Sequence, residues 1–149
     1  MSEEIYKVDS SNAELVSAVA LENVGIPGFF ITLDTETMDG KIAYTNACND
    51  AESLADHEGE VIHMTGAFIV PGYRRDRNGG PSRPCANTYL IDADGVAYFS
   101  QSDGIARSLS QIHGICPNLD GGNGYLPIAV KSKKLANGNT IKSIVIIKE

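Results

Sequence analysis

The fold is decided by one stretch of sequence, NTYLIDADGV AYFSQSDGIA RSLSQIHG, which spans residues 87–114. Its first half contains two β-prone runs separated by the turn-forming tetrapeptide Asp-Ala-Asp-Gly at 92–95, a pattern that predicts a hairpin. Its second half predicts a helix, because Ser102 suits the N-cap, Asp103 suits the first turn, and apolar residues follow at helical spacing as far as Gly114. The stretch therefore predicts a hairpin that leads directly into a short helix.

Two further β-prone runs close the chain. Residues 126–135 and 140–148 flank Asn137-Gly138, a dipeptide that favours a tight hairpin turn. The sequence therefore predicts a terminal antiparallel pair after the helix.

Upstream, residues 61–70 predict a long strand whose apolar side chains share one face. Gly66 falls on that face and predicts a bulge or a sharp bend, and Pro71-Gly72 is expected to end the strand. Residues 73–84 combine four arginines with glycine and proline, which predicts a long mobile loop. The apolar face of the predicted strand consists of Ile62, Met64, Phe68 and Val70.

The N-terminal part predicts one more hairpin and one more helix. The β-prone runs 29–33 and 41–45 flank Asp39-Gly40, a second hairpin signal. Residues 1–28 predict an N-terminal helical extension, with a serine N-cap and apolar residues at helical spacing. Residues 29–149 are expected to form the main domain.

The order of elements predicts a mainly β fold, an OB-like antiparallel barrel with a short helix before its C-terminal hairpin. An OB-fold has three strands before its helix and two after it. The sequence predicts five strands before the helix. Either the first hairpin is an added element, or one long bent strand reads as two.

Charge is divided unevenly along this acidic chain, whose net charge is −7. Residues 1–72 contain 13 acids against Lys7 and Lys41, whereas residues 73–149 contain 10 lysines and arginines against 6 acids. Such a division steers a polyanion towards one face and keeps the molecule soluble.

Cations lie beside aromatic rings in the basic half, the combination with which proteins hold single-stranded nucleic acid. Tyr73-Arg74-Arg75 has both chemistries side by side, and three lysines form a second cluster near the last predicted turn. Lys131 and Lys133 are expected on one strand face, opposite to Val130. The candidate binding residues are Tyr73, Arg74, Arg75, Arg77, Arg83, Tyr44, Tyr89, Tyr98, Lys131, Lys133 and Lys134.

Other kinds of site have weaker support. The segment Asp34-Thr35-Glu36 resembles the first motif of DnaQ-like exonucleases, since alternation on a strand would place both carboxylates on one face for metal binding. The histidines and further carboxylates of such nucleases have no matching pattern here.

Three widely spaced cysteines, without a CxxC pair, predict reduced thiols. We expect neither a metal nor a cofactor, no membrane partner and a cytoplasmic location, in the host cytoplasm if a phage encodes the protein.

Several of these segments together resemble the single-stranded DNA-binding proteins of small protein-primed phages, phi-twenty-nine type. The resemblance covers residues 29–149 in order, and rests on 33–42, 59–62, the strand pair around 92–98, the short helix and the closing hairpin. It implies an OB-like fold, no enzymatic activity and binding of displaced DNA strands without sequence preference. The N-terminal helix and the arginine loop depart from the family pattern.

The leading hypothesis is therefore a non-enzymatic protein that protects displaced strands of single-stranded DNA during replication, either as a homo-oligomer or as a cooperative array. A DNA polymerase or another replication protein is the expected further partner. The second hypothesis is a protein-interaction module that docks a replication enzyme without DNA contact. The third is a metal-dependent 3′–5′ exonuclease-like protein that uses Asp34 and Glu36.

Overall fold

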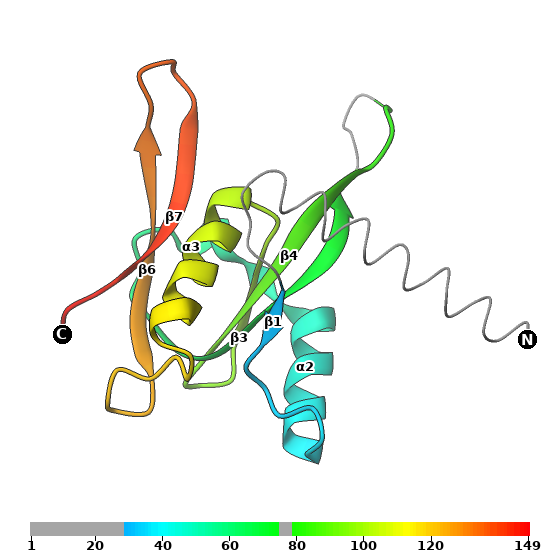
Figure 1. Ribbon diagram of the computed structural model, residues 1–149, viewed down its shortest axis with the longest axis vertical. Helices are drawn as coiled ribbons and strands as arrows, with labels where there is room; N and C mark the ends of the chain where they lie inside the picture. The colour runs from blue at the N-terminus through cyan, green and yellow to red at the C-terminus, as the bar shows by residue number, and fades with distance from the viewer. Residues whose placement is uncertain (1–28, 75–78) are drawn as a thin grey trace, which may run out of the picture.

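The computed structural model describes residues 29–74 and 79–149, so the N-terminal helix expected over 1–28 lies outside the described residues. Within them the fold is mainly β, with one curled half-barrel sheet of seven strands and two α-helices (Figure 1). This agrees with the OB-like barrel predicted from the sequence. The elements are β1 (Phe30–Ile31), α2 (Met38–Asp50), β2 (Glu52–Ser53), the 3₁₀ turn η1 (Leu54–His57), β3 (Ile62–Arg74), β4 (Arg83–Asp92), β5 (Ala97–Ser100), α3 (Asp103–Ile115), β6 (Leu126–Lys134) and β7 (Thr140–Ile146).

The strand order is β2-β5-β4-β3-β6-β7, with β1 paired to β3. The short β2–β5 pair is parallel, and the other pairs are antiparallel. β3 is the central strand, because it pairs with both β4 and β6. Its pairing with β4 covers most of its length, whereas its pairing with β6 covers only Ile62–Met64. The sheet therefore opens beyond that short contact into two separate hairpins, β3–β4 and β6–β7.

Each face of the sheet carries its own apolar cluster. The main core contains Ile69 of β3, together with Ile105 and Leu109 of α3. The smaller cluster contains the neighbouring Phe68, packed against Ala47 of α2. Because adjacent strand residues point to opposite faces, α3 covers one face of the sheet and α2 covers the other.

Three predictions from the sequence are confirmed. Residues 92–95 form the turn of the β4–β5 hairpin. α3 begins after Ser102, whose Oγ accepts a hydrogen bond from the backbone N–H of Ile105 at 3.4 Å. β6 and β7 pair from Ile128↔Ile146 to Lys134↔Thr140, as expected of a terminal hairpin.

The hairpin predicted around Asp39-Gly40 is wrong, because these residues lie in the first turn of α2. Thr37 is the N-cap, and its Oγ1 accepts a hydrogen bond from the backbone N–H of Gly40 at 3.1 Å. A Cβ on Gly40 would lie 1.8 Å from the backbone oxygen of Asp34. This glycine therefore permits close packing at a helix start, where the sequence suggested a tight β turn.

Two predictions about β3 are wrong and one is confirmed. The register shifts between Met64 and Gly66, so the predicted bulge is present. The inserted residue reverses the alternation: Met64 belongs to the main core, whereas Phe68 and Val70 lie with the smaller cluster on the other face. The strand does not end at Pro71-Gly72 but continues to Arg74, and β4 begins at Arg83. Within the predicted arginine loop, Tyr73 and Arg74 therefore belong to β3, Arg83 and Pro84 belong to β4, and residues 79–82 lie outside the strands.

Candidate nucleic-acid interface

A groove of about 750 Å³ lies where the two hairpins separate over the start of α3. Figure 1 shows the strands of both hairpins extending towards the same end of the molecule, with the N-terminal end of α3 between them. Arg74 lines the groove from β3, Lys142 lines it from β7, and Arg107 lines it from α3. Asp103 is the one acid among the described residues that line this groove.

The end of the β3–β4 ribbon forms the first wall. Tyr73 lies on the face of β3 that also carries Ile69, the face covered by α3, and its side chain is 52% exposed. Arg74 and Arg83 are direct cross-strand partners. Two like charges directly opposite each other are destabilising, and a bound phosphate would relieve their repulsion.

Gln101, which follows β5, holds this wall in place. Its Nε2 donates a hydrogen bond to Oδ1 of Asn87 at 3.0 Å, and its backbone oxygen accepts one from the guanidinium of Arg74. The Asn87 amide lies over Gly72, where an added Cβ would approach it to 2.3 Å. The hairpin base is thus tied to the β5–α3 junction next to the groove.

The β6–β7 hairpin forms the second wall. Lys134 pairs with Thr140, a groove-lining residue, and lies on the same face of the hairpin as Lys142. Lys131 and Lys133 lie on the opposite face, so the prediction that these two lysines share a face is confirmed. The hydroxyl of Ser132 donates a hydrogen bond to Glu58, which links this wall to the segment after η1.

The floor of the groove is the first turn of α3 packed tightly on β7. A Cβ on Gly104 would lie 2.1 Å from the backbone oxygen of Lys142, so glycine allows this close approach. The approach places the cationic side chains of α3 and β7 along one groove.

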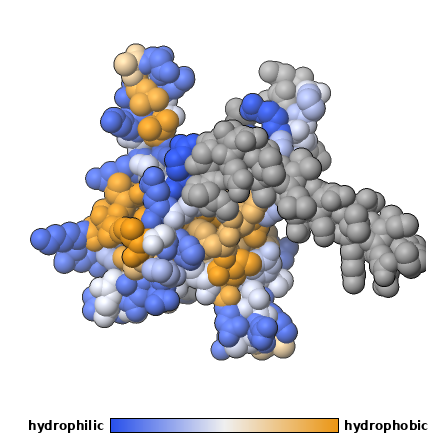
Figure 2. Space-filling model, viewed as in Figure 1, coloured by the Kyte–Doolittle hydropathy of each residue, from blue (hydrophilic) through white to orange (hydrophobic). Residues whose placement is uncertain are grey.

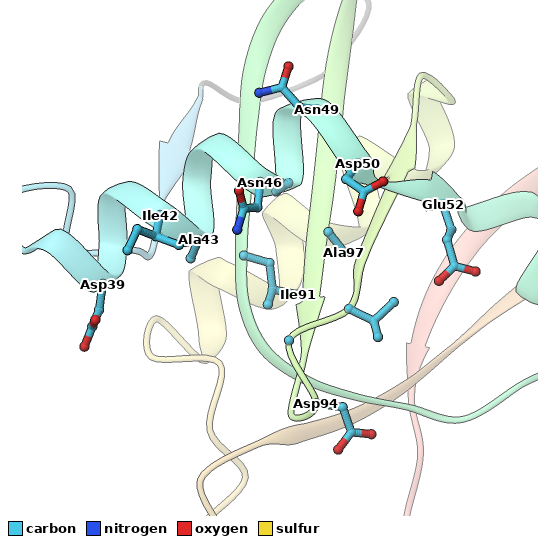
Figure 3. A pocket seen from close by; sticks show the side chains of 13 residues that line it. Asp39, Ile42, Ala43, Asn46, Asn49, Asp50, Glu52, Ile91, Asp94 and Ala97 are labelled. Carbon is cyan, nitrogen blue, oxygen red and sulfur yellow. The ribbon is translucent and has the colours of Figure 1, made fainter.

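A second pocket has the opposite charge. It measures about 800 Å³ and lies between α2 and the β4–β5 turn (Figure 3). Its described lining residues include no lysine, arginine or histidine, and its floor is made of Ile91, Ala97 and their neighbours. We call it the acidic pocket, because four carboxylates line it: Asp39, Asp50, Glu52 and Asp94. A DNA strand would be repelled here and attracted to the groove.

The three predicted strand tyrosines are packed rather than open. Tyr44 lies on α2 and stacks on Phe68 with ring centroids 4.6 Å apart. Tyr89 is 9% exposed and also stacks on Phe68, with ring centroids 4.6 Å apart. Tyr98 is 8% exposed, and its hydroxyl donates a hydrogen bond to Oδ2 of Asp92 at 3.1 Å. Burial, then the Asp92 contact, raises the pKa of Tyr98 to about 12. A DNA-binding role for these tyrosines stays a prediction.

The structure thus brings together some of the predicted residues and adds two. Arg74 lines the groove, Tyr73 precedes it on β3, Arg83 is its cross-strand partner, and Lys134 is the cross-strand partner of the groove-lining Thr140. Arg75 and Arg77 lie outside the described residues. The additional residues Arg107 and Lys142 were missed, although strand alternation after the predicted Asn137-Gly138 turn would have placed Lys142 beside Lys134.

Asp34 and Glu36 do not lie on a strand, so the predicted nuclease geometry is wrong. They belong to the turn before α2, in which Oδ1 of Asp34 accepts a hydrogen bond from the backbone N–H of Glu36 at 3.1 Å. Among the described residues, no group of three or more metal-ligating side chains is found.

The comparison with family models decides the relationship. The model described as Phage Single-stranded DNA-binding protein, of the phi-twenty-nine type, matches residues 26–146. The chain belongs to this family. No curated protein and no solved structure matches the chain. The family therefore indicates single-stranded DNA as the ligand of this chain. No helix in the described part of the chain has the length and apolar character needed to span a membrane.

Proposed function

We propose that the groove between the two hairpins binds single-stranded DNA without sequence preference, and that the protein protects displaced strands during replication. The observation that carries this proposal is the excess of positive charge in the groove. Its described lining residues include Arg74, Arg107 and Lys142 but only one acidic residue, Asp103. The family supports single-stranded DNA as the ligand in general. In this proposal the strand runs along the groove between the two hairpins.

The proposed binding mode uses features that all DNA strands share. Arg74 and Arg83 on one wall, with Lys134 and Lys142 on the other, would contact phosphates, which position a strand but carry no sequence information. The exposed ring of Tyr73 would stack on a base, and every base has a π-face. Binding without sequence preference follows from this pair of contacts.

Protection of displaced strands follows from binding of this kind, because a strand held in a protein groove is less accessible to nucleases. A DNA polymerase or another replication protein as partner, and a cytoplasmic location, stay predictions. The proposal requires binding alone and assigns no catalytic step.

A titration with fluorescent oligo-dT, compared with duplex DNA of equal length, tests the proposal. We expect oligo-dT to bind more tightly and a mixed-sequence single strand to bind comparably. Bound single strands should also resist digestion by a single-strand nuclease. Equal affinity for duplex DNA, or no binding to oligo-dT at low salt, would contradict the proposed function.

A further inference from the structure

The β6–β7 hairpin has a second cationic face, whose two lysines do not line the groove. Lys131 pairs with Ser143 and Lys133 pairs with Ile141, so these side chains point away from Lys134 and Lys142. Within the described residues, neither Lys131 nor Lys133 has an ion-pair partner. Ile141, the cross-strand partner of Lys133, is 46% exposed and also borders the groove, and Figure 2 shows hydrophobic atoms beside hydrophilic ones on this hairpin. The outer hairpin face therefore offers ammonium groups around an apolar side chain.

The acidic pocket offers the complementary chemistry. Figure 3 shows Asp39, Asp50 and Asp94 around the apolar side chains of Ile91 and Ala97. Ile42 adds a half-exposed apolar side chain to the lining. A volume of about 800 Å³ lies within the range of pockets that enclose a small ligand, so it can accept the tips of a few side chains.

The carboxylates of this pocket are largely unused within the chain. Glu52 contacts His57 at 3.2 Å, but Asp39, Asp50 and Asp94 have no ion-pair partner among the described residues. Asp50 is the last residue of α2, and the last turn of that helix contains no basic residue. A carboxylate at a helix C-terminus is disfavoured by the helix dipole. The stability of α2 therefore gives no reason for an aspartate at position 50. Contact with a cationic partner would give one, because it would stabilise the carboxylate.

We propose that the outer hairpin face of one copy, formed by Lys131, Lys133 and Ile141, docks in the acidic pocket of the next copy. The two surfaces lie towards opposite ends of the molecule (Figure 1), so one copy offers each surface to a different neighbour. A contact between two different surfaces repeats as an open array when its rotation does not close a ring. The inner hairpin face, with Lys134 and Lys142, stays available for DNA.

Such a contact can be weak and still organise proteins on DNA. Exposed charge pairs are individually weak. Copies bound to one strand face each other at a high effective concentration, so a weak contact becomes significant there. The inference rests on the proposed DNA binding and predicts that long single strands are covered cooperatively.

Two lengths of oligo-dT separate this inference from the proposed function. An oligomer that holds one copy measures DNA affinity alone, and a long oligomer adds the contact between copies. We expect Asp50→Asn/Asp94→Asn to lower the cooperativity of binding to the long strand by about 5- to 10-fold. Affinity for the short oligomer should stay within about twofold of wild type. The matched control Glu36→Gln/Asp56→Asn removes two exposed carboxylates outside the pocket and should keep full cooperativity.

Charge reversal supplies a second readout. Asp50→Lys/Asp94→Lys and Lys131→Glu/Lys133→Glu should each abolish cooperativity, and their combination in one chain should restore it. Carbodiimide should join the 131–134 segment of one copy to pocket carboxylates of another on long oligo-dT.

Non-cooperative binding by the wild-type protein would overturn the inference, as would full cooperativity in Asp50→Asn/Asp94→Asn. An equal loss in the Glu36→Gln/Asp56→Asn control would also overturn it, because net charge alone would then explain the effect. Failure of the wild-type protein to bind the short oligomer would contradict the proposed function instead.

Discussion

At the scale of single residues, Tyr73 is the most exposed of the four candidate tyrosines, with 52% of its side chain accessible. It lies at the end of β3, and its neighbour Arg74 lines the groove. The strand tyrosines expected to share its role are packed against other rings or hydrogen-bonded. Base stacking is therefore expected at Tyr73 before any other tyrosine.

Replacement of Tyr73 by alanine should weaken binding of oligo-dT by about 1–3 kcal/mol, the usual contribution of one stacked base. Tyr73→Phe keeps the aromatic face and should bind almost as the wild type does. Equilibrium titration of both variants measures the difference. A loss of the same size in both variants would mean that the hydroxyl, not the ring, makes the contact.

Tyr98 makes a different prediction, about pH and stability. Its pKa is raised to about 12 in the folded protein, against an ordinary value of 10.0. Above pH 10 the unfolded chain therefore loses the phenol proton while the folded protein keeps it, so stability falls as pH rises from 10 to about 12. The loss from this group is on the order of 2 kcal/mol.

Tyr98→Phe removes this group from the titration and should flatten the alkaline loss of stability. The expected cost of the variant at neutral pH is about 1 kcal/mol, for the lost hydrogen bond to Asp92. Urea unfolding at several pH values between neutral and 11 measures both effects. An identical pH dependence in the variant and the wild type would show that other groups cause the loss.

At the scale of elements, strong local signals were sufficient for the β4–β5 hairpin, α3 and the terminal hairpin. Each has a turn sequence or an N-cap that matches its structure, such as Ser102 for α3. α2 could not be found in this way, because Gly40 and Ala47 are its only buried residues and it lacks an amphipathic pattern. The Asp-Gly pair at its start then favoured the wrong prediction of a turn.

The start of α2 can be tested by substitution at Gly40. A Cβ there would overlap the backbone oxygen of Asp34, so Gly40→Ala should lower the free energy of unfolding by about 1–3 kcal/mol. Gly114 lies in the last turn of α3 with nothing within 4 Å of an added Cβ, so Gly114→Ala is the matched control. The control should be neutral or stabilising by up to about 1 kcal/mol. Equal effects in urea unfolding would contradict the tight helix start.

At the scale of the whole molecule, the charge imbalance between the two halves of the sequence becomes a separation in space. Acids of the first half, with Asp94 of the β4–β5 turn, surround the acidic pocket, whereas the groove is lined by cations of the second half, which are Arg74, Arg107 and Lys142. The sequence predicted that a polyanion would be steered to one face, but not where that face lies. Arg107 and Lys142 meet Arg74 only because β7 and α3 pack together and the hairpins flank them, contacts between segments far apart in the chain.

The most direct test of the groove is the salt dependence of oligo-dT binding in two matched double variants. Lys134→Ala/Lys142→Ala removes Lys142, which lines the groove, and Lys134, which lies on the same face of that hairpin, whereas Lys41→Ala/Lys148→Ala removes two lysines outside the groove. Each phosphate contact contributes about 0.7 to the slope of log affinity against log salt, so the groove variant should reduce the slope by about 1.4. The control should keep the wild-type slope. An unchanged slope in the groove variant, or an equal reduction in both, would contradict DNA binding in the groove.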